Sequence, residues 1–185
     1  MAEAVNRSMA EQAVRDLLSA FCIEEKPGME ETPSRVVKML EEVWEGEQYS
    51  NEELAEKYGK TFPVATTDMV LVKDIEAFSY CEHHLALIYD MKVSVGYYPH
   101  GKVIGLSKIA RIVDMCCKRL QVQERIGEDI AGVMSLIVGP DVIVRIEASH
   151  SCMTARGIKR PSSKTVTVTK RGRFIDDCEE FMSCL

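Results

Sequence analysis

Three of the four histidines in the chain lie within three residues of a cysteine, in two short segments. The first segment is Cys-Glu-His-His at residues 81–84, and the second is His-Ser-Cys at residues 150–152. A thiolate and an imidazole separated by two residues suit Zn²⁺, a borderline-soft ion that prefers tetrahedral sulfur and nitrogen ligands. A second thiolate from the distant segment would complete three protein ligands and leave the fourth position for water. Because structural zinc sites usually close with four protein ligands, the residues predict a catalytic zinc site.

The spacing also predicts how these side chains lie. Cys81 and His84 cannot share one face of a regular strand, so we expect a turn between them. His150 and Cys152 project the same way if the chain is extended, which would place His150 beside the metal. The alternative is that the cysteines are buried thiols and the histidines hydrogen-bonded core groups, the better interpretation for any one residue alone. Their clustering favours the metal site, whereas His100, alone in a Pro-Gly turn, is expected at the surface.

The composition is typical of one compact domain. A chain of 185 residues with 46% hydrophobic residues can bury one ordinary core. Its net charge of -6 excludes a general binder of nucleic acid or of anionic membranes, because either needs an excess of Lys and Arg. Without a signal-peptide pattern or a run of about 18 apolar residues, the chain is expected to be soluble and cytoplasmic. Its seven cysteines are expected to be reduced thiols or metal ligands.

The first part of the chain is predicted to be helical. Ser8 opens a capping box, and apolar residues then recur at helical spacing. A second helix is expected to begin with Thr32 as N-cap and Pro33 at the first helical position. A short third helix is expected over residues 51–59. These elements define a predicted N-terminal helical region, residues 1–66.

Residues 67–185 are predicted to form the catalytic region of an α+β fold. The elements expected from periodicity are strands over 69–78 and 91–97, helices over 106–120 and 122–137, and strands over 142–147 and 165–169. This order, ββααββ, predicts an antiparallel four-stranded sheet with two long helices on one face. The other face and the edges of such a sheet need cover, which suggests closure through neighbouring subunits.

Four motifs in this order and spacing resemble the GTP cyclohydrolase I family. They are Cys81-Glu82-His83-His84, GLSKIAR at residues 105–111, QVQER at residues 121–125, and HSCM at residues 150–153 followed by Arg156-Gly157. The resemblance runs from about residue 31 to residue 174. The family has the tunnelling fold, whose ββααββ core agrees with the order of elements predicted above.

The resemblance implies a zinc enzyme that acts on GTP. It makes Cys81, His84 and Cys152 the zinc ligands, His83 the neighbouring acid/base group and His150 a second active-site histidine. The implied reaction opens the guanine imidazole ring of GTP, releases formate and rearranges the product to 7,8-dihydroneopterin triphosphate, the first step of tetrahydrofolate or pterin biosynthesis. Imidazoles suit the proton transfers of this route, because they titrate near neutral pH.

The resemblance also implies how the guanine is recognised. Glu124 matches the family carboxylate that accepts hydrogen bonds from the guanine N1–H and exocyclic amine, which adenine cannot supply. Gln123, beside it, is expected among the substrate-binding residues. From this stretch alone, a solvated helix residue is the favoured interpretation of Glu124, and only the family match reverses it.

The remaining motif residues resemble triphosphate contacts, contributed partly by adjacent subunits. They are Ser107, Lys108, Arg111, Arg156 and Lys38, with Arg35 as an additional candidate. A helix start offers free N–H groups and a positive dipole, and residues at i, i+1 and i+4 can surround a phosphate. The alternative is a charged surface of a helix, so this assignment depends on the motif. The resemblance implies a homo-oligomer, a ring of ten subunits with shared active sites.

The sequence departs from the family pattern at two places. After His84 the family commonly shows a proline and an aromatic-glycine turn, whereas residues 85–90 (LALIYD) contain neither Pro nor Gly, so the hairpin geometry is open. Near the C-terminus, where the family often carries an Arg before Glu-Phe, this chain has CEEF at residues 178–181. We expect altered terminal packing without a change in chemistry.

Three other functions compete with this interpretation. A zinc nucleoside deaminase would need His-x-Glu followed by Pro-Cys-x-x-Cys, which is absent. A zinc-stabilised scaffold or nucleotide sensor would bind GTP without turnover, and His83 and His150 argue against it. A relative that binds a pterin or deazapurine in the same fold would do other chemistry, and the Cys-Glu-His-His motif distinguishes it.

Overall fold

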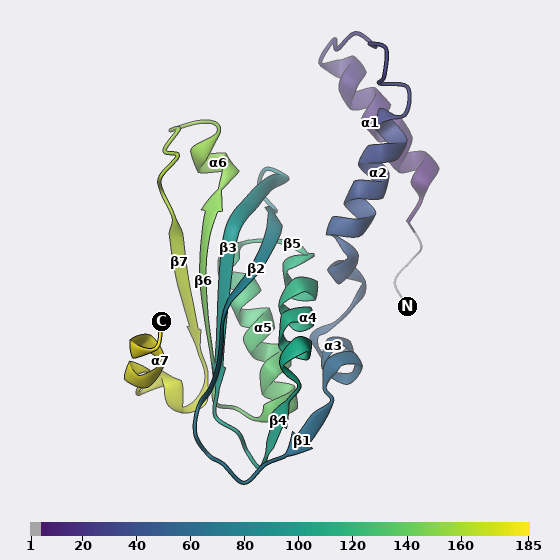
Figure 1. The fold of residues 1–185 in the computed structure, drawn as a ribbon. Coiled ribbons are helices and arrows are strands. Elements are labelled where there is room, and N and C mark those ends of the chain that lie inside the picture. Colours follow the sequence, from purple (N-terminus) through teal and green to yellow (C-terminus); the bar gives the residue numbers. More distant parts are fainter. Residues whose placement is uncertain (1–4) are drawn as a thin grey trace.

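The computed structural model describes residues 5–185 and confirms the α+β class (Figure 1). The part of the predicted N-terminal region that precedes residue 5 lies outside the described residues. Four helical elements come first, namely α1 (Arg7–Ala20), α2 (Thr32–Val43), the 3-10 helix η1 (Glu45–Gln48) and α3 (Asn51–Tyr58). Figure 1 shows α1 and α2 lying side by side as a pair that projects from the rest of the molecule.

The predicted helix starts are wrong by one or two residues. The N-cap of α1 is Asn6, whose Oδ1 accepts from the Met9 N–H at 3.1 Å, while Ser8 lies inside the helix. Asn6 precedes Ser8 and offers an equivalent side-chain acceptor, so the helix begins earlier. In α2, Thr32 is already helical and Glu31 is the N-cap. The short helix α3 was predicted, and its capping box is formed by Ser50 and Glu53.

The main sheet has five strands instead of the predicted four. Its order is β5-β2-β3-β6-β7, with β5 (Leu120–Gln121), β2 (Val70–Cys81), β3 (Ala86–Tyr97), β6 (Val142–His150) and β7 (Thr165–Lys170). The four predicted strands are antiparallel neighbours, and β5 adds to β2 in the parallel sense. A second sheet pairs β1 (Thr61–Pro63) with β4 (Lys102–Ile104). Strands of two or three residues show no alternation, so periodicity did not predict them.

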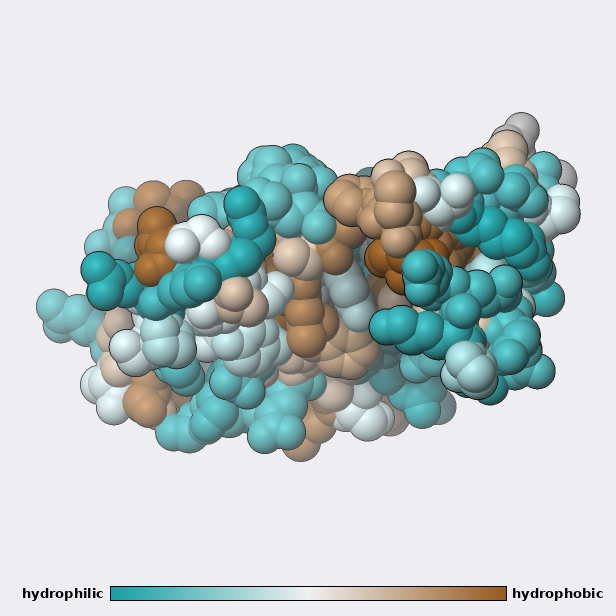
Figure 2. Space-filling model, turned by 90° about the horizontal axis from the view of Figure 1, so that it is seen from above, coloured by the Kyte–Doolittle hydropathy of each residue, from teal (hydrophilic) through white to brown (hydrophobic). Residues whose placement is uncertain are grey.

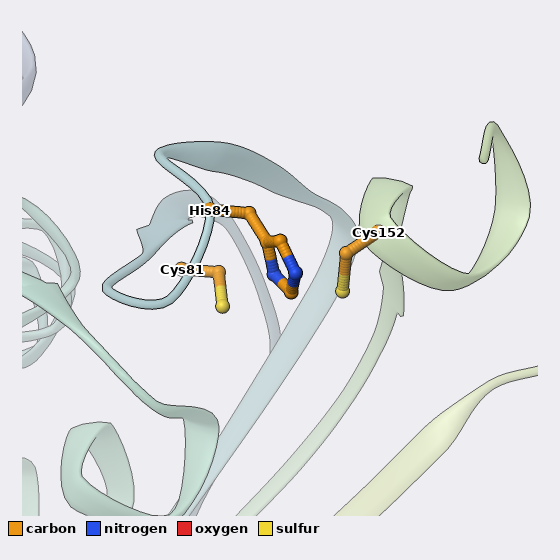
Figure 3. Close-up of side chains that lie close together, drawn as sticks. All are labelled: Cys81, His84 and Cys152. Carbon is orange, nitrogen blue, oxygen red and sulfur yellow. The ribbon is translucent and has the colours of Figure 1, made fainter. Parts of the chain in front are cut away.

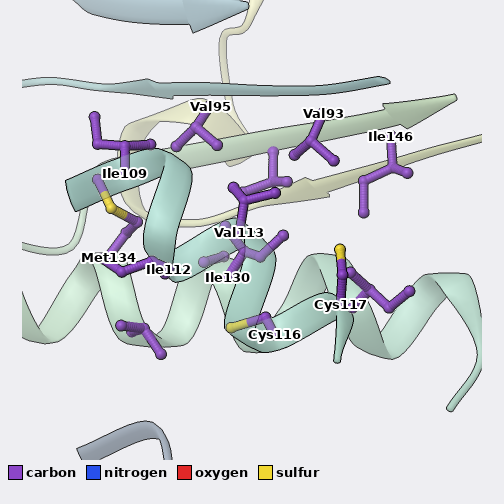
Figure 4. Packing of buried hydrophobic residues seen from close by; sticks show 14 of the residues in the cluster. Val93, Val95, Ile109, Ile112, Val113, Cys116, Cys117, Ile130, Met134 and Ile146 are labelled. Atoms are coloured by element: carbon purple, nitrogen blue, oxygen red, sulfur yellow. The ribbon is translucent and has the colours of Figure 1, made fainter. Parts of the chain in front are cut away.

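The helices α4 (Leu106–Cys117) and α5 (Gln123–Val138) cover one face of the main sheet (Figure 1). Their apolar residues interlock with those of β3 and β6, as Figure 4 shows for Val93, Ile109 and Ile130. Cys116 and Cys117 are buried in this core, and burial raises the pKa of Cys116 to about 12 and that of Cys117 well above its usual range. Both side chains are therefore neutral thiols of the core.

The C-terminal segment covers part of the opposite face through η2 (Gly172–Ile175) and α7 (Glu179–Ser183). Phe174 and Phe181 are buried there against β3 and β6. At Gly96 of β3, an added Cβ would lie 2.7 Å from the Phe181 ring, so the absence of a side chain allows this contact. The end of the chain is thus part of the fold, and two short elements that the periodicity did not predict hold it there. The short helix α6 (Ser151–Thr154) was likewise not predicted.

The hairpin between β2 and β3 turns without glycine. Leu85 and Asp90 adopt positive φ angles of 50° and 48°, a region that non-glycine residues rarely enter. The register of β3 against β6 shifts between Tyr89 and Lys92, next to Asp90. The segment after His84 is therefore accommodated by two non-glycine residues in the left-handed region, which glycine enters without strain.

The face shown in Figure 2 carries several groups of apolar side chains among hydrophilic ones. Apolar side chains gather on the N-terminal helices, where Met9, Leu17 and Phe21 are exposed. An apolar pocket of about 340 Å³ lies between α1 and α2, lined by residues that include Val14 and Trp44. Among residues 5–185, no helix combines the length and the apolar character that crossing a membrane requires.

Candidate metal centre and active site

Cys81, His84 and Cys152 bring one ligand atom each to within 4.8 Å of one another (Figure 3). Cys81 is buried, Cys152 is half-buried and His84 is exposed. Ligands of a tetrahedral zinc lie roughly 3.5–3.8 Å apart, given Zn–S near 2.3 Å and Zn–N near 2.0 Å. The spacing and the sulfur-nitrogen donor set therefore fit a borderline-soft ion, with a coordination position left over. The predicted meeting of two distant segments at one point is confirmed.

The turn after β2 brings His84 back towards Cys81. The backbone N–H groups of His84 and Leu85 both donate to the Cys81 carbonyl, at 3.3 and 2.9 Å. This confirms the predicted turn between Cys81 and His84. The turn closes because Leu85 takes the left-handed conformation.

The second segment reaches the site through the sheet. In the register of β3 with β6, Ile88 lies opposite His150, so the end of β6 is close to the turn that follows β2. The chain then enters α6 at Ser151, and Cys152 points from this helix towards His84 (Figure 3). The extended geometry expected for His150 and Cys152 is therefore not found, because a helical turn begins between them.

The two candidate acid/base histidines have different surroundings. The side chain of His83 is 64% exposed, and its Nδ1 lies 3.7 Å from Cys81 Sγ. His150 is partly buried, and its Nε2 lies 2.8 Å from Gln123 Oε1. Burial lowers the pKa of His150, because the interior disfavours the charged ring, and the carboxylate of Glu124 acts in the opposite direction. His150 is therefore biased towards the neutral form.

The first turn of α5 lies against the same end of the sheet. Glu124 is exposed in this turn, near enough to His150 to act on its pKa. Arg125, the next residue, places Nη1 2.6 Å from Oε2 of Glu82, within the turn that carries the metal-ligand candidates. Glu82 and Arg125 belong to sequence motifs, but the sequence predicted no role for either. Nothing in their spacing indicates that two residues 43 positions apart form a pair.

The predicted triphosphate contacts on α4 lie away from the Cys-His-Cys group of the same chain. Ser107 and Lys108 are in the first turn of α4 and Arg111 is near its middle. The end of this helix leads into β5, which pairs with β2 at Cys81. About 15 Å of helix axis separates Ser107 from the last residue of α4, at 1.5 Å per residue. Figure 1 shows the start of α4 near β4 and its end near β5.

Two further candidates lie on α2, which stands apart from the sheet (Figure 1). Arg35 and Lys38 are both exposed, and Arg35 pairs with Glu31 at 2.8 Å. Arg156 follows α6 and is exposed beyond Cys152. Of the basic candidates, Arg156 is therefore the one that the chain places close in sequence and space to the metal-ligand group. His100 lies outside the site, as expected, and pairs with Asp141 at 2.9 Å.

Together, the fold and the Cys-His-Cys group define a candidate metal-binding protein of the α+β class. The family model described as GTP cyclohydrolase I matches residues 10–185. The chain is 52% identical to "GTP cyclohydrolase 1" of Clostridium botulinum (strain Kyoto / Type A2) over 182 residues, which cover 94% of this chain and 93% of the relative. It is 53% identical to the protein of that name from Ruminiclostridium cellulolyticum over 183 residues, 94% of this chain and 93% of the relative.

The chain therefore belongs to the GTP cyclohydrolase I family and is an enzyme of the hydrolase class. A solved structure titled "Crystal structure of the archaeosine synthase QueF-Like in the apo form" aligns with a TM-score of 0.46 at 20% identity, covering 58% of this chain and 95% of the other.

Proposed function

We propose that this chain is a zinc-dependent GTP cyclohydrolase I. It would convert GTP and water to formate and 7,8-dihydroneopterin triphosphate, the first step of tetrahydrofolate or pterin biosynthesis, in the cytoplasm. The observation that carries this proposal is the meeting of Cys81, His84 and Cys152 at one point beside His83 and His150. In this proposal residues 67–185 are the catalytic region with the tunnelling fold, and the helical elements that the structure describes from residue 5 onward precede it.

Zinc is the metal that the donor set fits best. Two thiolates and one imidazole are soft to borderline ligands, which disfavour Mg²⁺ and Ca²⁺. Zinc held by Cys81, His84 and Cys152 would supply Lewis acidity to water at its remaining position. The hydrolytic step needs such an activated water near the guanine C8.

His83 and His150 would move protons during ring opening and rearrangement. The exposed ring of His83 can exchange protons with solvent, and the partly buried ring of His150 is biased towards the neutral form that accepts a proton. The two rings come from different segments of the chain, so each can serve a different atom of the substrate.

Glu124 would select guanine. Its carboxylate is exposed at the start of α5 and carries no hydrogen bond from another described side chain, so it is open to a ligand. A carboxylate accepts from the guanine N1–H and the exocyclic amine together, whereas adenine has no N1–H to donate. GTP would thus be preferred over ATP.

The triphosphate would be bound between subunits. Ser107 and Lys108 lie at the end of α4 that is remote from the metal-ligand group, and Arg111 lies one turn further along this helix. Lys38 and Arg35 lie on α2. One chain therefore provides the metal site and the phosphate-binding residues at different places. A homo-oligomer, a ring of ten subunits, would bring the residues of one subunit to the metal site of its neighbour, with Arg156 supplied from the chain that binds the metal.

The test is turnover by the purified, zinc-loaded protein. GTP is supplied, and formate and the absorbance of a pterin product are followed, with ATP and metal-stripped protein as controls. Zinc-dependent formate and pterin from GTP alone would support the proposal. Formate without pterin would limit the activity to ring opening. Binding of GTP without any product would overturn the enzymatic assignment in favour of a sensor or of other pterin chemistry.

A further inference from the structure

The side chain of Gln123 is enclosed within the protein. It belongs to the first residue of α5 and is 1% exposed. Its Nε2 lies 3.2 Å from each of three acceptors, the carbonyls of Ile146 and Thr165 and the hydroxyl of Thr167. Its Oε1 lies 2.8 Å from His150 Nε2. Every polar atom of this amide therefore has a partner inside the chain.

These partners determine which way the amide faces. The amide has two N–H donors on nitrogen and only acceptor capacity on oxygen. If the amide were flipped, its oxygen would face two backbone carbonyls, neither of which can donate a hydrogen bond. The flipped amide would lose the hydrogen bonds to Ile146 and Thr165 in a buried place, where unpaired polar groups are costly. The orientation with Oε1 towards His150 is thus imposed by β6 and β7.

The orientation of the amide in turn determines the role of each nitrogen in the His150 ring. Because Oε1 can only accept, the hydrogen bond at 2.8 Å requires a proton on His150 Nε2. A neutral imidazole with its proton on Nε2 carries its lone pair on Nδ1. The nitrogen available to accept a proton is then Nδ1.

We propose that Gln123 is a positioning residue, which holds the His150 ring in place and selects its Nε2–H tautomer, and that its side chain does not contact the substrate. The inference rests on the proposed function for the part that His150 plays in catalysis. The hydrogen-bond pattern itself does not depend on that function. It differs from the expectation that Gln123 binds substrate, because a side chain that is 1% exposed and fully paired has no free group to offer.

Gln121 provides a matched control on the same stretch of chain. It is 2% exposed, and its Nε2 donates to the Cys116 carbonyl at 2.7 Å. The substitutions Gln123→Met and Gln121→Met each remove a buried amide with its hydrogen bond to backbone. Only the first removes an acceptor for His150. A loss that comes from burial alone should therefore appear in both variants.

The first measurement is solid-state NMR of protein labelled with ¹⁵N in its histidine rings, at a pH where His150 is neutral. Comparison with His150→Ala assigns the signals, since the chain has only four histidines. The wild type should show a protonated Nε2 and an unprotonated Nδ1 for His150, and Gln123→Met should show a mixture of tautomers. A proton on Nδ1 in the wild type, or an unchanged tautomer in Gln123→Met, would overturn the proposal.

The second measurement is turnover in a double-mutant cycle. Gln123→Met should lower kcat by about 10²-fold, the scale of a misplaced catalytic group, with KM for GTP changed less than about twofold. In the His150→Ala background the same substitution should have almost no further effect, whereas Gln121→Met should act independently of His150. A rise in KM at constant kcat, or an equal loss in both backgrounds, would contradict the positioning role. If the wild type itself produces no formate, the proposed function fails, and the NMR measurement still decides the role of Gln123.

Discussion

Arg125 joins the start of α5 to the turn that carries the metal-ligand candidates, because its Nη1 lies 2.6 Å from Oε2 of Glu82. Glu82 lies between Cys81 and His83, and Arg125 follows Glu124. The pair thus couples the group that would hold the metal to the group that would hold the guanine. The side chain of Glu82 is 30% exposed and that of Arg125 is 53% exposed, so solvent and salt screen the attraction between them.

Breaking this pair should affect the alignment of the metal-ligand turn with the start of α5 more than the stability of the fold. Glu82→Gln is expected to lower kcat/KM for GTP by about two- to fivefold at low ionic strength, and less at high salt, because exposed pairs are weak and screened. The exchanged double variant, Glu82→Arg with Arg125→Glu, should recover part of the loss. Steady-state kinetics at two salt concentrations measures this. An effect that is equal at both salts and is not recovered by the exchange would argue against the coupling.

Removal of one thiolate should empty the metal centre. Cys152→Ala leaves one sulfur and one nitrogen ligand, so we expect zinc content below about one tenth of that of the wild type and formate release lowered by at least about 10³-fold. Metal analysis and a formate assay check both. Cys22→Ala, at an exposed cysteine far from the group in sequence, should retain zinc and activity. Normal turnover by a zinc-free protein would contradict the mechanism.

Glu124 should act mainly on binding. Glu124→Gln keeps the shape but loses the charge that accepts two hydrogen bonds, so KM for GTP should rise by about 10- to 100-fold with a smaller change in kcat. Glu128→Gln is the matched control, since Glu128 is exposed one turn later on α5 and pairs with Arg171. Steady-state kinetics with GTP separates KM from kcat. Equal effects of the two substitutions would show that charge in general, and not recognition of guanine, is responsible.

Shared active sites predict that two inactive variants restore each other. Cys152→Ala removes the metal site of its own chain, and Arg111→Ala removes a phosphate contact that we assign to the neighbouring subunit. When the two variants are dissociated and reassembled together, about a quarter of the sites should combine an intact metal site with an intact Arg111, if the subunits mix at random. Recovery of formate release measures this, with each variant reassembled alone as the control. A full site within each chain would give no recovery.

The sequence by itself determined the elements and the chemical nature of the site. Helical periodicity predicted α4 and α5, and alternation predicted β3, β6 and β7, because these elements bury one face and their residues repeat with a fixed period. A run of strand-forming residues predicted β2. The spacing of Cys81 and His84 predicted the turn and the metal, since ligand type and local geometry are properties of adjacent residues. The predicted positions of the helix caps were wrong by one or two residues, because competing acceptors such as Asn6 and Ser8 lie only two positions apart.

Only the tertiary structure decided how these parts meet. The parallel pairing of β5 with β2, the contact of Gln123 with His150 across 27 positions and the pair of Arg125 with Glu82 all depend on segments that folding brings together. The length of α4 likewise separates Ser107 from the metal-ligand group of its own chain, which the motif alone could not indicate. Periodicity reports which face of an element is buried. Which residues meet across that face follows from register and packing, and these are set by the whole chain.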